Sequence, residues 1–279
     1  METFFSFLER RVDDCSSLLC VGLDPHVKDL PKPTAEAALQ YCQNIVQQTA
    51  PYAAAFKPNA AFFEAFGPEG WTALYKLIEV IKKESISIGS MIPVILDAKR
   101  GDIASTAEAY ARSAFQNLGV HAITLSPYLG KDSLDPFLTV PEKGIFLLCK
   151  TSNPRSGDLQ DLPVTPTGEK SPCPLYLHVA QLAQKWNTGN NIGLVVGATQ
   201  PEALEQVRAA APDLWFLAPG IGTQGGDLRT ALQVGLRKDG KGMLVNVSRA
   251  IARAEKPGLA AAELRDEILN LQREIYQES

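Results

Sequence analysis

The chain has 279 residues, of which 45% are hydrophobic and 21% are charged, so it can bury a large core. Its formal net charge of −4 at pH 7 argues against a nucleic-acid-binding protein, because such proteins usually carry a basic face. No stretch approaches the roughly 20 consecutive apolar residues that a membrane-spanning helix needs, so we expect no membrane segment.

The first residues of the chain predict a short amphipathic helix. Within Met1–Cys15, charged residues interrupt a cluster of phenylalanines, which is typical of a helix packed on a core and not of a signal peptide. The five cysteines of the chain are scattered and include no C-x-x-C pair, so the sequence indicates neither disulfides nor a zinc site. We therefore expect a cytoplasmic protein.

Eight short apolar runs follow, each ending in polar or glycine residues. Valine, isoleucine and leucine dominate them without clean polar alternation, as in parallel strands that are covered on both faces. The predicted strands are Leu18–Asp24, Ala53–Pro58, Ile92–Lys99, Ala122–Pro127, Gly144–Ser152, Ile192–Thr199, Trp215–Pro219 and Met243–Val247.

Helical patterns lie between these runs. They cover Thr34–Thr49, Trp71–Lys83, Ser105–Leu118, Pro174–Trp186, Pro201–Ala211 and Gly226–Leu236. Strands and helices that alternate through eight repeats predict an α/β fold, a TIM (β/α)8 barrel, which we expect to form a single catalytic domain over 1–279. An open doubly wound sheet is the alternative, but no Gly-x-Gly-x-x-Gly follows the first strand.

The longest irregular stretch is Asn153–Cys173, which contains several prolines and two glycines. A loop of this length inside a compact domain is often a lid over a functional site. A tolerated surface insertion explains the same composition, so both interpretations stay open.

Charged residues gather at the ends of the first three predicted strands. The third strand ends in Asp97 and Lys99, and residues two apart on a strand face the same way, here towards the barrel axis. Asp102 follows in the next loop, so we expect it to converge with them. Lys57 ends strand two and Asp24 ends strand one, at the C-terminal mouth where barrel enzymes keep their chemistry.

A structural ion-pair network is the alternative interpretation of these charges. Burying each ion costs several kcal/mol, and apolar side chains would serve stability better. The pattern therefore favours an active site.

A second pattern predicts a phosphate site on the other half of the mouth. The glycine-rich run Pro219–Asp227 follows strand seven and contains Gln224, and Ser248-Arg249 follows strand eight. Loops after strands seven and eight, with a helix N-terminus, form the recurrent phosphate site of this fold. The Arg249 guanidinium adds a planar, charged fork for phosphate oxygens.

Together these motifs resemble the orotidine monophosphate decarboxylase family. The resemblance rests on the Asp-x-Lys-x-x-Asp run Asp97–Asp102, on Phe56-Lys57-Pro58-Asn59, on Pro219–Asp227 and on the Ser248-Arg249 step. It covers nearly the whole chain, from Asp24 to Arg249. Arg100 and the long loop after strand five are similar to the extended-chain bacterial subgroup (type 2).

The resemblance implies decarboxylation of orotidine 5′-monophosphate to uridine 5′-monophosphate and carbon dioxide, a step of de novo pyrimidine biosynthesis, without a cofactor or metal. Lys99 would donate a proton to C6, flanked by Asp97 and Asp102, and Lys57 would complete a charged tetrad. The implied substrate contacts are Asp24 to ribose, Ser152 to the base, and Gln224 and Arg249 to phosphate.

The resemblance also implies a homodimer with shared active sites, in which Asp102 and Thr106 reach into the partner's site. His26, after strand one, is either a loop histidine or a neighbour of the site.

Two rival functions are considered. A magnesium-dependent aldolase or decarboxylase of the same superfamily shares Asp-x-Lys-x-x-Asp, but it uses a carboxylate from strand two for the metal, where this chain has Lys57. A non-catalytic sensor of phosphate ligands would need no paired lysines and acids opposite the phosphate loop.

Overall fold

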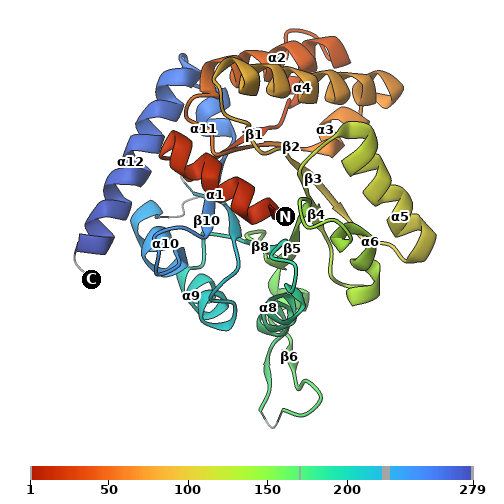
Figure 1. Cartoon of the computed structure of the whole chain (residues 1–279), viewed down its shortest axis with the longest axis vertical. Helices are drawn as coiled ribbons and strands as arrows, with labels where there is room; N and C mark the ends of the chain where they lie inside the picture. Colours follow the sequence, from red (N-terminus) through yellow and green to blue (C-terminus); the bar gives the residue numbers. More distant parts are fainter. Residues whose placement is uncertain (1, 170, 222–226, 278–279) are drawn as a thin grey trace.

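The computed structural model describes residues 2–169, 171–221 and 227–277. Within these residues, a ring of parallel strands encloses the centre of the molecule and helices surround it (Figure 1). The strand order is β2-β1-β10-β9-β8-β5-β4-β3. Bridges from Phe56 to Val94 and from Asn59 to Asp97 join β2 to β3 and close the ring. The predicted TIM barrel is confirmed.

Each predicted apolar run coincides with one barrel strand, although β3 ends one residue beyond its run. The strands are β1 (Leu19–Leu23), β2 (Ala55–Pro58), β3 (Ile95–Arg100), β4 (Ala122–Leu125), β5 (Gly144–Lys150), β8 (Ile192–Val196), β9 (Phe216–Pro219) and β10 (Met243–Val247). Several predicted runs extend beyond these bounds, because their last residues turn into the loops of the mouth. Most strand residues are buried, as expected for a sheet covered on both faces.

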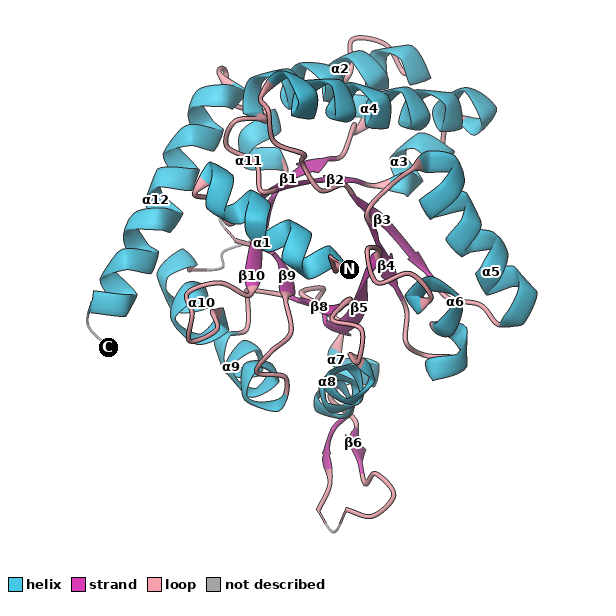
Figure 2. Ribbon diagram, in the orientation of Figure 1, coloured by secondary structure: helices cyan, strands magenta, loops and turns pink. Residues whose placement is uncertain are grey.

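The helices form the outer layer, except that α1 lies across one end of the barrel (Figure 2). They are α1 (Phe4–Cys15), α2 (Ala35–Thr49), α3 (Ala60–Glu64), α4 (Gly67–Ser87), α5 (Ala104–Arg112), α6 (Asp135–Leu138), α7 (Gly157–Gln160), α8 (Leu175–Trp186), α9 (Pro201–Ala210), α10 (Leu228–Gly235), α11 (Arg249–Ala252) and α12 (Pro257–Gln277). The first residue of the helix expected over Gly226–Leu236 lies outside the described residues. None of the described helices is both long and apolar enough to cross a membrane.

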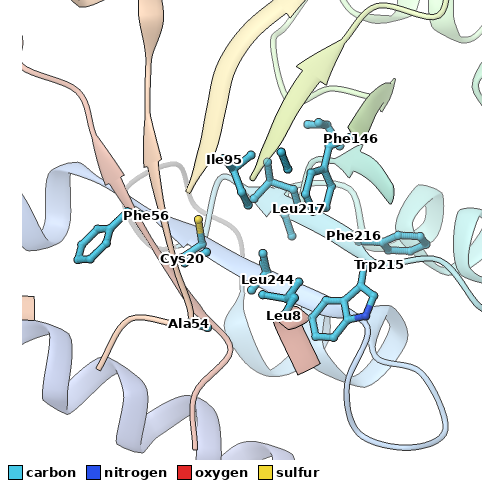
Figure 3. Packing of buried hydrophobic residues seen from close by; sticks show 14 of the residues in the cluster. Leu8, Cys20, Ala54, Phe56, Ile95, Phe146, Trp215, Phe216, Leu217 and Leu244 are labelled. Carbon is cyan, nitrogen blue, oxygen red and sulfur yellow. The ribbon is translucent and has the colours of Figure 1, made fainter. Parts of the chain in front are cut away.

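Helix α1 closes the end of the barrel opposite the mouth. Its Phe5 ring stacks on Trp215 at 6.3 Å and meets Phe146 edge-on at 5.6 Å. Figure 3 shows Leu8 of the same helix next to Leu244 and Trp215. The amphipathic helix predicted for the start of the chain is confirmed, and its apolar face completes the barrel core.

The long loop after β5 divides into two parts. At its base, Lys150 pairs with Asp161, and Thr151 and Gln160 exchange hydrogen bonds. Further on, β6 (Pro163–Val164) and β7 (Cys173–Pro174) pair as an antiparallel hairpin that projects away from the barrel (Figure 2). The first part therefore belongs to the barrel rim, whereas the hairpin has the form of a surface insertion.

Candidate active site

A buried aspartate at the mouth lies between two lysines. Lys57 Nζ is 2.9 Å from Asp97 Oδ2, and Lys99 Nζ is 2.5 Å from Asp97 Oδ1. Lys57 and Asp97 are 5% and 9% exposed, whereas the Lys99 side chain is half-exposed and borders the opening. The prediction that Asp97 and Lys99 face the same way is confirmed.

The two lysines decide the charge state of this cluster. Burial alone would raise the pKa of Asp97, but the charges of Lys57 and Lys99 outweigh it and hold that pKa well below its ordinary value. Burial would likewise lower the pKa of Lys57, but Asp97 and Asp24 raise it above its ordinary value. Asp97 and Lys57 are therefore both charged at neutral pH.

Strand β3 is irregular where it carries these residues. Its pairing with β4 shifts register between Leu96 and Arg100, and Lys99 has a φ of +48°. Such bulges bend a strand and redirect its side chains, often beside active sites. Here the bulge turns Lys99 back towards Asp97, so both ends of that ion pair lie on one short segment.

The structure adds Thr124 of β4 to the residues predicted from the sequence. Its hydroxyl donates to Asp97 Oδ1 at 3.1 Å and accepts from the backbone N–H groups of Ala98 and Lys99 at 3.0 Å and 2.9 Å. The only signal in the sequence was a polar residue inside the apolar run predicted over Ala122–Pro127.

A cavity of about 190 Å³ adjoins the cluster. One wall is polar and includes Lys57, Asp97, Lys99 and Thr124, while Leu148, Val195 and Leu217 supply an apolar wall. Ser152, the predicted base contact, lines the same cavity. Gly197 permits this placement, because a Cβ there would lie 3.0 Å from Ser152 Cβ. Such a cavity can hold a flat ring between an apolar surface and a row of charges.

Two buried carboxyl or amide oxygens point to ligand contacts. Among the described residues, Asp24 Oδ1 and Asn246 Oδ1 are buried without a hydrogen-bond partner. A buried acceptor without a donor is costly, so both oxygens fit a ligand that carries hydroxyl groups. Asp24 was predicted as a ribose contact. Asn246 was not, although its place at the end of β10 beside Ser248 was a usable signal.

The structure describes one of the two predicted phosphate contacts, Arg249. Arg249 begins α11 and is exposed, and its guanidinium has no partner within the described part of the chain. A Cβ on Gly22 would lie 2.7 Å from Ser248 Cβ and 3.3 Å from Asp24 Oδ2, so the end of β1 and the start of α11 approach closely. Gln224 lies outside the described residues.

Asp102 and Thr106 are not brought into this cluster. The Asp102 carboxylate accepts from the N–H of Ile103 at 2.8 Å, whereas the Lys99 ammonium pairs with Asp97. Thr106 is exposed on α5. The expected convergence of Asp102 with Asp97 and Lys99 is thus not seen within one chain, because the Lys99 ammonium pairs with Asp97 and Asp102 does not line the cavity beside them.

Two further predictions from the sequence concern His26 and metal binding. The His26 ring packs edge-on against Phe62 at 4.4 Å, which favours the loop-histidine interpretation. Within the described ranges, no three His, Cys, Asp or Glu side chains are arranged to hold a metal. Both oxygens of Asp97 are engaged by ammonium groups.

Comparison with known proteins identifies the family. Residues 17–264 match the model of the orotidine 5′-phosphate decarboxylase / HUMPS family. The chain belongs to this family. A Roseiflexus castenholzii orotidine 5′-phosphate decarboxylase is 47% identical, over 95% of this chain and 97% of that protein. Another from Bordetella pertussis is 45% identical, over 95% and 98%. The enzyme is accordingly a carboxy-lyase, an orotidine 5′-phosphate decarboxylase.

Solved structures agree with this decarboxylase assignment. The Leishmania donovani OMP decarboxylase is 53% identical, with a TM-score of 0.85 over 97% of this chain and 98% of that one. The Leishmania donovani UMP synthase is 54% identical, with a TM-score of 0.86 over 98% of this chain and 57% of that longer one.

Proposed function

We propose that this decarboxylase converts orotidylate to uridylate and carbon dioxide without a cofactor, with Lys99 as the proton donor to C6. The observation that carries the proposal is the Lys57–Asp97–Lys99 cluster beside a cavity with one apolar wall. Loss of carbon dioxide from C6 leaves a carbanion that the pyrimidine cannot delocalise. An ammonium held in place beside C6 stabilises that charge and then supplies the proton.

Asp97 has two roles in this proposal. It fixes the Lys99 ammonium at 2.5 Å, and its negative charge would lie near the carboxylate that leaves. The apolar wall of the cavity favours carbon dioxide over the carboxylate from which it forms, because carbon dioxide carries no net charge. Lys57 keeps Asp97 charged in this buried place.

The rest of the substrate would occupy the other half of the mouth. Asp24 and Asn246 offer buried oxygens to the ribose hydroxyls, Ser152 lies beside the base, and Arg249 with Gln224 would bind the phosphate. Binding energy from the phosphate, far from C6, can drive closure of the loops around the base.

The proposed assembly is a homodimer with shared sites. Asp102 and Thr106 lie outside the cluster of their own chain. The loops after the neighbouring strands β3 and β4 expose apolar side chains: Ile103, next to Asp102 in the chain, is 54% exposed, and Tyr128, after β4, is 77% exposed. A partner covering this face would bury that surface and receive Asp102 in its site. The free cysteines agree with a reducing cytoplasm, where de novo pyrimidine biosynthesis would use this enzyme.

The test is a turnover assay. Purified protein mixed with orotidylate should cause the ultraviolet absorbance change of uridylate formation, and the rate should survive exhaustive treatment with EDTA. A rate that collapses in EDTA and returns with Mg²⁺ would instead support the magnesium-dependent rival. Tight binding of phosphate compounds without turnover would support the sensor.

A further inference from the structure

Thr124 occupies the one position of β4 that faces the bulge of β3. Ile95 pairs with Ala122 and Leu96 with Ile123, but the next pair joins Arg100 to Leu125. Three residues of β3, 97–99, therefore stand opposite Thr124 alone. The amide groups of Ala98 and Lys99 donate to its side chain.

The Thr124 hydroxyl uses its full hydrogen-bonding capacity there. A hydroxyl has one donor and two acceptor sites. Its proton goes to Asp97 Oδ1, and its lone pairs accept the two amides. The same oxygen of Asp97 holds the Lys99 ammonium. One buried side chain, 1% exposed, thus touches both the backbone of Lys99 and the carboxylate that orients its ammonium.

The backbone of Lys99 requires such support. Its φ of +48° lies in the left-handed region, which long side chains seldom adopt. A conformation of this kind persists only where surrounding contacts hold it, and such residues cluster at active sites. The hydrogen bond from Lys99 N to Thr124 Oγ1, at 2.9 Å, acts directly on the residue that carries this φ.

We propose that Thr124 is a positioning residue for the decarboxylation. It holds the bulge in the form that places the Lys99 ammonium on Asp97, and it fixes the Asp97 carboxylate between the two lysines. The proposal rests on the proposed role of Lys99 as proton donor. Thr124 acts on the reaction through Lys99 and Asp97, so its loss should lower kcat much more than it raises KM.

Two substitutions separate the hydroxyl from the shape of the side chain. Thr124→Val keeps the volume and removes all three hydrogen bonds, whereas Thr124→Ser keeps the hydroxyl. We expect Thr124→Val to lower kcat by roughly 10- to 100-fold, as a misplaced reacting group does, with KM changed by less than about threefold. Thr124→Ser should stay within about threefold of the parent enzyme in kcat.

A matched control is Thr49→Val, in helix α2. Thr49 is also fully buried, but its hydroxyl donates to the Ile45 carbonyl of its own helix, at 2.8 Å. This variant should keep the parent kcat. If Thr124→Val does not fold, as judged by circular dichroism, Thr124→Ala replaces it, since alanine also lacks the hydroxyl and places no second methyl group against Asp97.

The experiment measures kcat and KM for orotidylate in these variants and in Lys99→Ala. A Lys99→Ala enzyme near the parent rate would overturn the proposed function itself. With Lys99→Ala inactive, a Thr124→Val enzyme at the parent kcat would overturn the role of Thr124. A Thr124→Ser enzyme as slow as Thr124→Val would do the same, because the hydroxyl would then not be the cause.

Discussion

A single carboxylate at the centre of the site, Asp97, contributes to the fold and has a role in the proposed reaction. Asp97 binds one buried lysine and one half-exposed lysine, and these two partners contribute differently. Lys57 neutralises the charge of Asp97, which would be costly to bury without a partner. Lys99 reaches the opening, where its pairing with Asp97 contributes less to stability because solvent screens it. The fold should therefore tolerate loss of Lys99, and the reaction should not.

The first prediction follows for Lys99→Ala. Asp97 keeps its bond to Lys57, so the melting temperature should stay within a few degrees of the parent value. The decarboxylation rate should fall by at least the roughly 100- to 10,000-fold that a positioned proton donor supplies. Stopped assays with high enzyme concentration and long incubation measure the residual rate. A variant within tenfold of the parent rate would contradict the role of Lys99.

A second prediction concerns Arg249. Its guanidinium is exposed and unpaired among the described residues, so Arg249→Ala should leave the fold intact. We expect kcat/KM for orotidylate to drop by roughly 100-fold, the loss typical of a charge-assisted contact. The phosphate-free nucleoside should lose little, because it never made that contact. Equal losses on both substrates would show that Arg249 is structural.

Residue identities and strand periodicity were enough to predict that Asp97 and Lys99 lie together at the end of the third strand, although in the structure the bulge of β3, and not regular alternation, brings their side chains into contact. Thr124 and the positive φ of Lys99 could not be predicted this way. They depend on how many residues of β3 stand opposite one residue of β4, which is a property of two strands together.

A buried lysine stabilises the base of the loop after β5, which forms part of the barrel rim. The Lys150 side chain is 3% exposed and pairs with Asp161 of the long loop, with its ammonium 5.3 Å from the centre of the Tyr176 ring. Thr151, the next residue, is bonded to Gln160. These contacts fix the segment that carries Ser152 into the cavity.

A third prediction tests that segment. Lys150→Met removes the charge and keeps the length, so the loop base should loosen and KM for orotidylate should rise roughly tenfold, with a smaller change in kcat. Lys131→Met is the control, because it breaks an exposed pair with Asp135 on the outer surface. Steady-state kinetics on both variants measure the difference. An unchanged KM in Lys150→Met would show that the rim does not depend on this pair.

A fourth prediction concerns the segment between β3 and β4. Burial, together with the charges of Lys143 and Lys82, lowers the pKa of His121 from 6.5 to about 4, and its Nδ1 accepts from Val94 N at 3.1 Å. Between these pH values the unfolded chain binds the proton and the folded chain does not, so stability should fall as pH decreases. The slope is about 1.4 kcal/mol per pH unit at most.

Urea unfolding at pH 7 and pH 5 measures this effect. In His121→Asn, the amide oxygen can replace Nδ1 as acceptor. The free energy of unfolding of this variant should depend less on pH, because the contribution of His121 is removed. His178→Asn, at a partly exposed position of α8, should keep the pH dependence of the parent. Identical slopes in the parent and in His121→Asn would contradict a buried neutral histidine.

The eight strands could be predicted because each is an apolar run of ordinary length. The hairpin of β6 and β7 could not, since each strand has two residues and both contain proline. The sequence predicts Ser113–Leu118 as the end of an α-helix, whereas the structure has a π-helical turn there, because the apolar spacing of this turn differs little from that of an α-helix.

In the whole molecule, Asp102 connects the proposed active site with the proposed dimer. Its carboxylate turns to the N–H of Ile103 in its own chain, next to apolar side chains left at the surface. If Asp102 enters the site of a partner across a two-fold axis, each site combines Lys99 of one chain with Asp102 of the other. Neither Lys99→Ala nor Asp102→Ala would then be active alone.

The last prediction is that a mixture of the two inactive variants regains activity. In a mixed dimer, one site has both substitutions and the other has intact Lys99 from one chain and intact Asp102 from the other. Random reassociation makes about half of the dimers mixed, so about a quarter of all sites should recover. The two proteins are denatured together, refolded and assayed, with subunit exchange followed by mass labels. Exchange without any gain over the separate variants would show that Asp102 serves its own chain, because a site contained in one chain cannot be complemented by mixing.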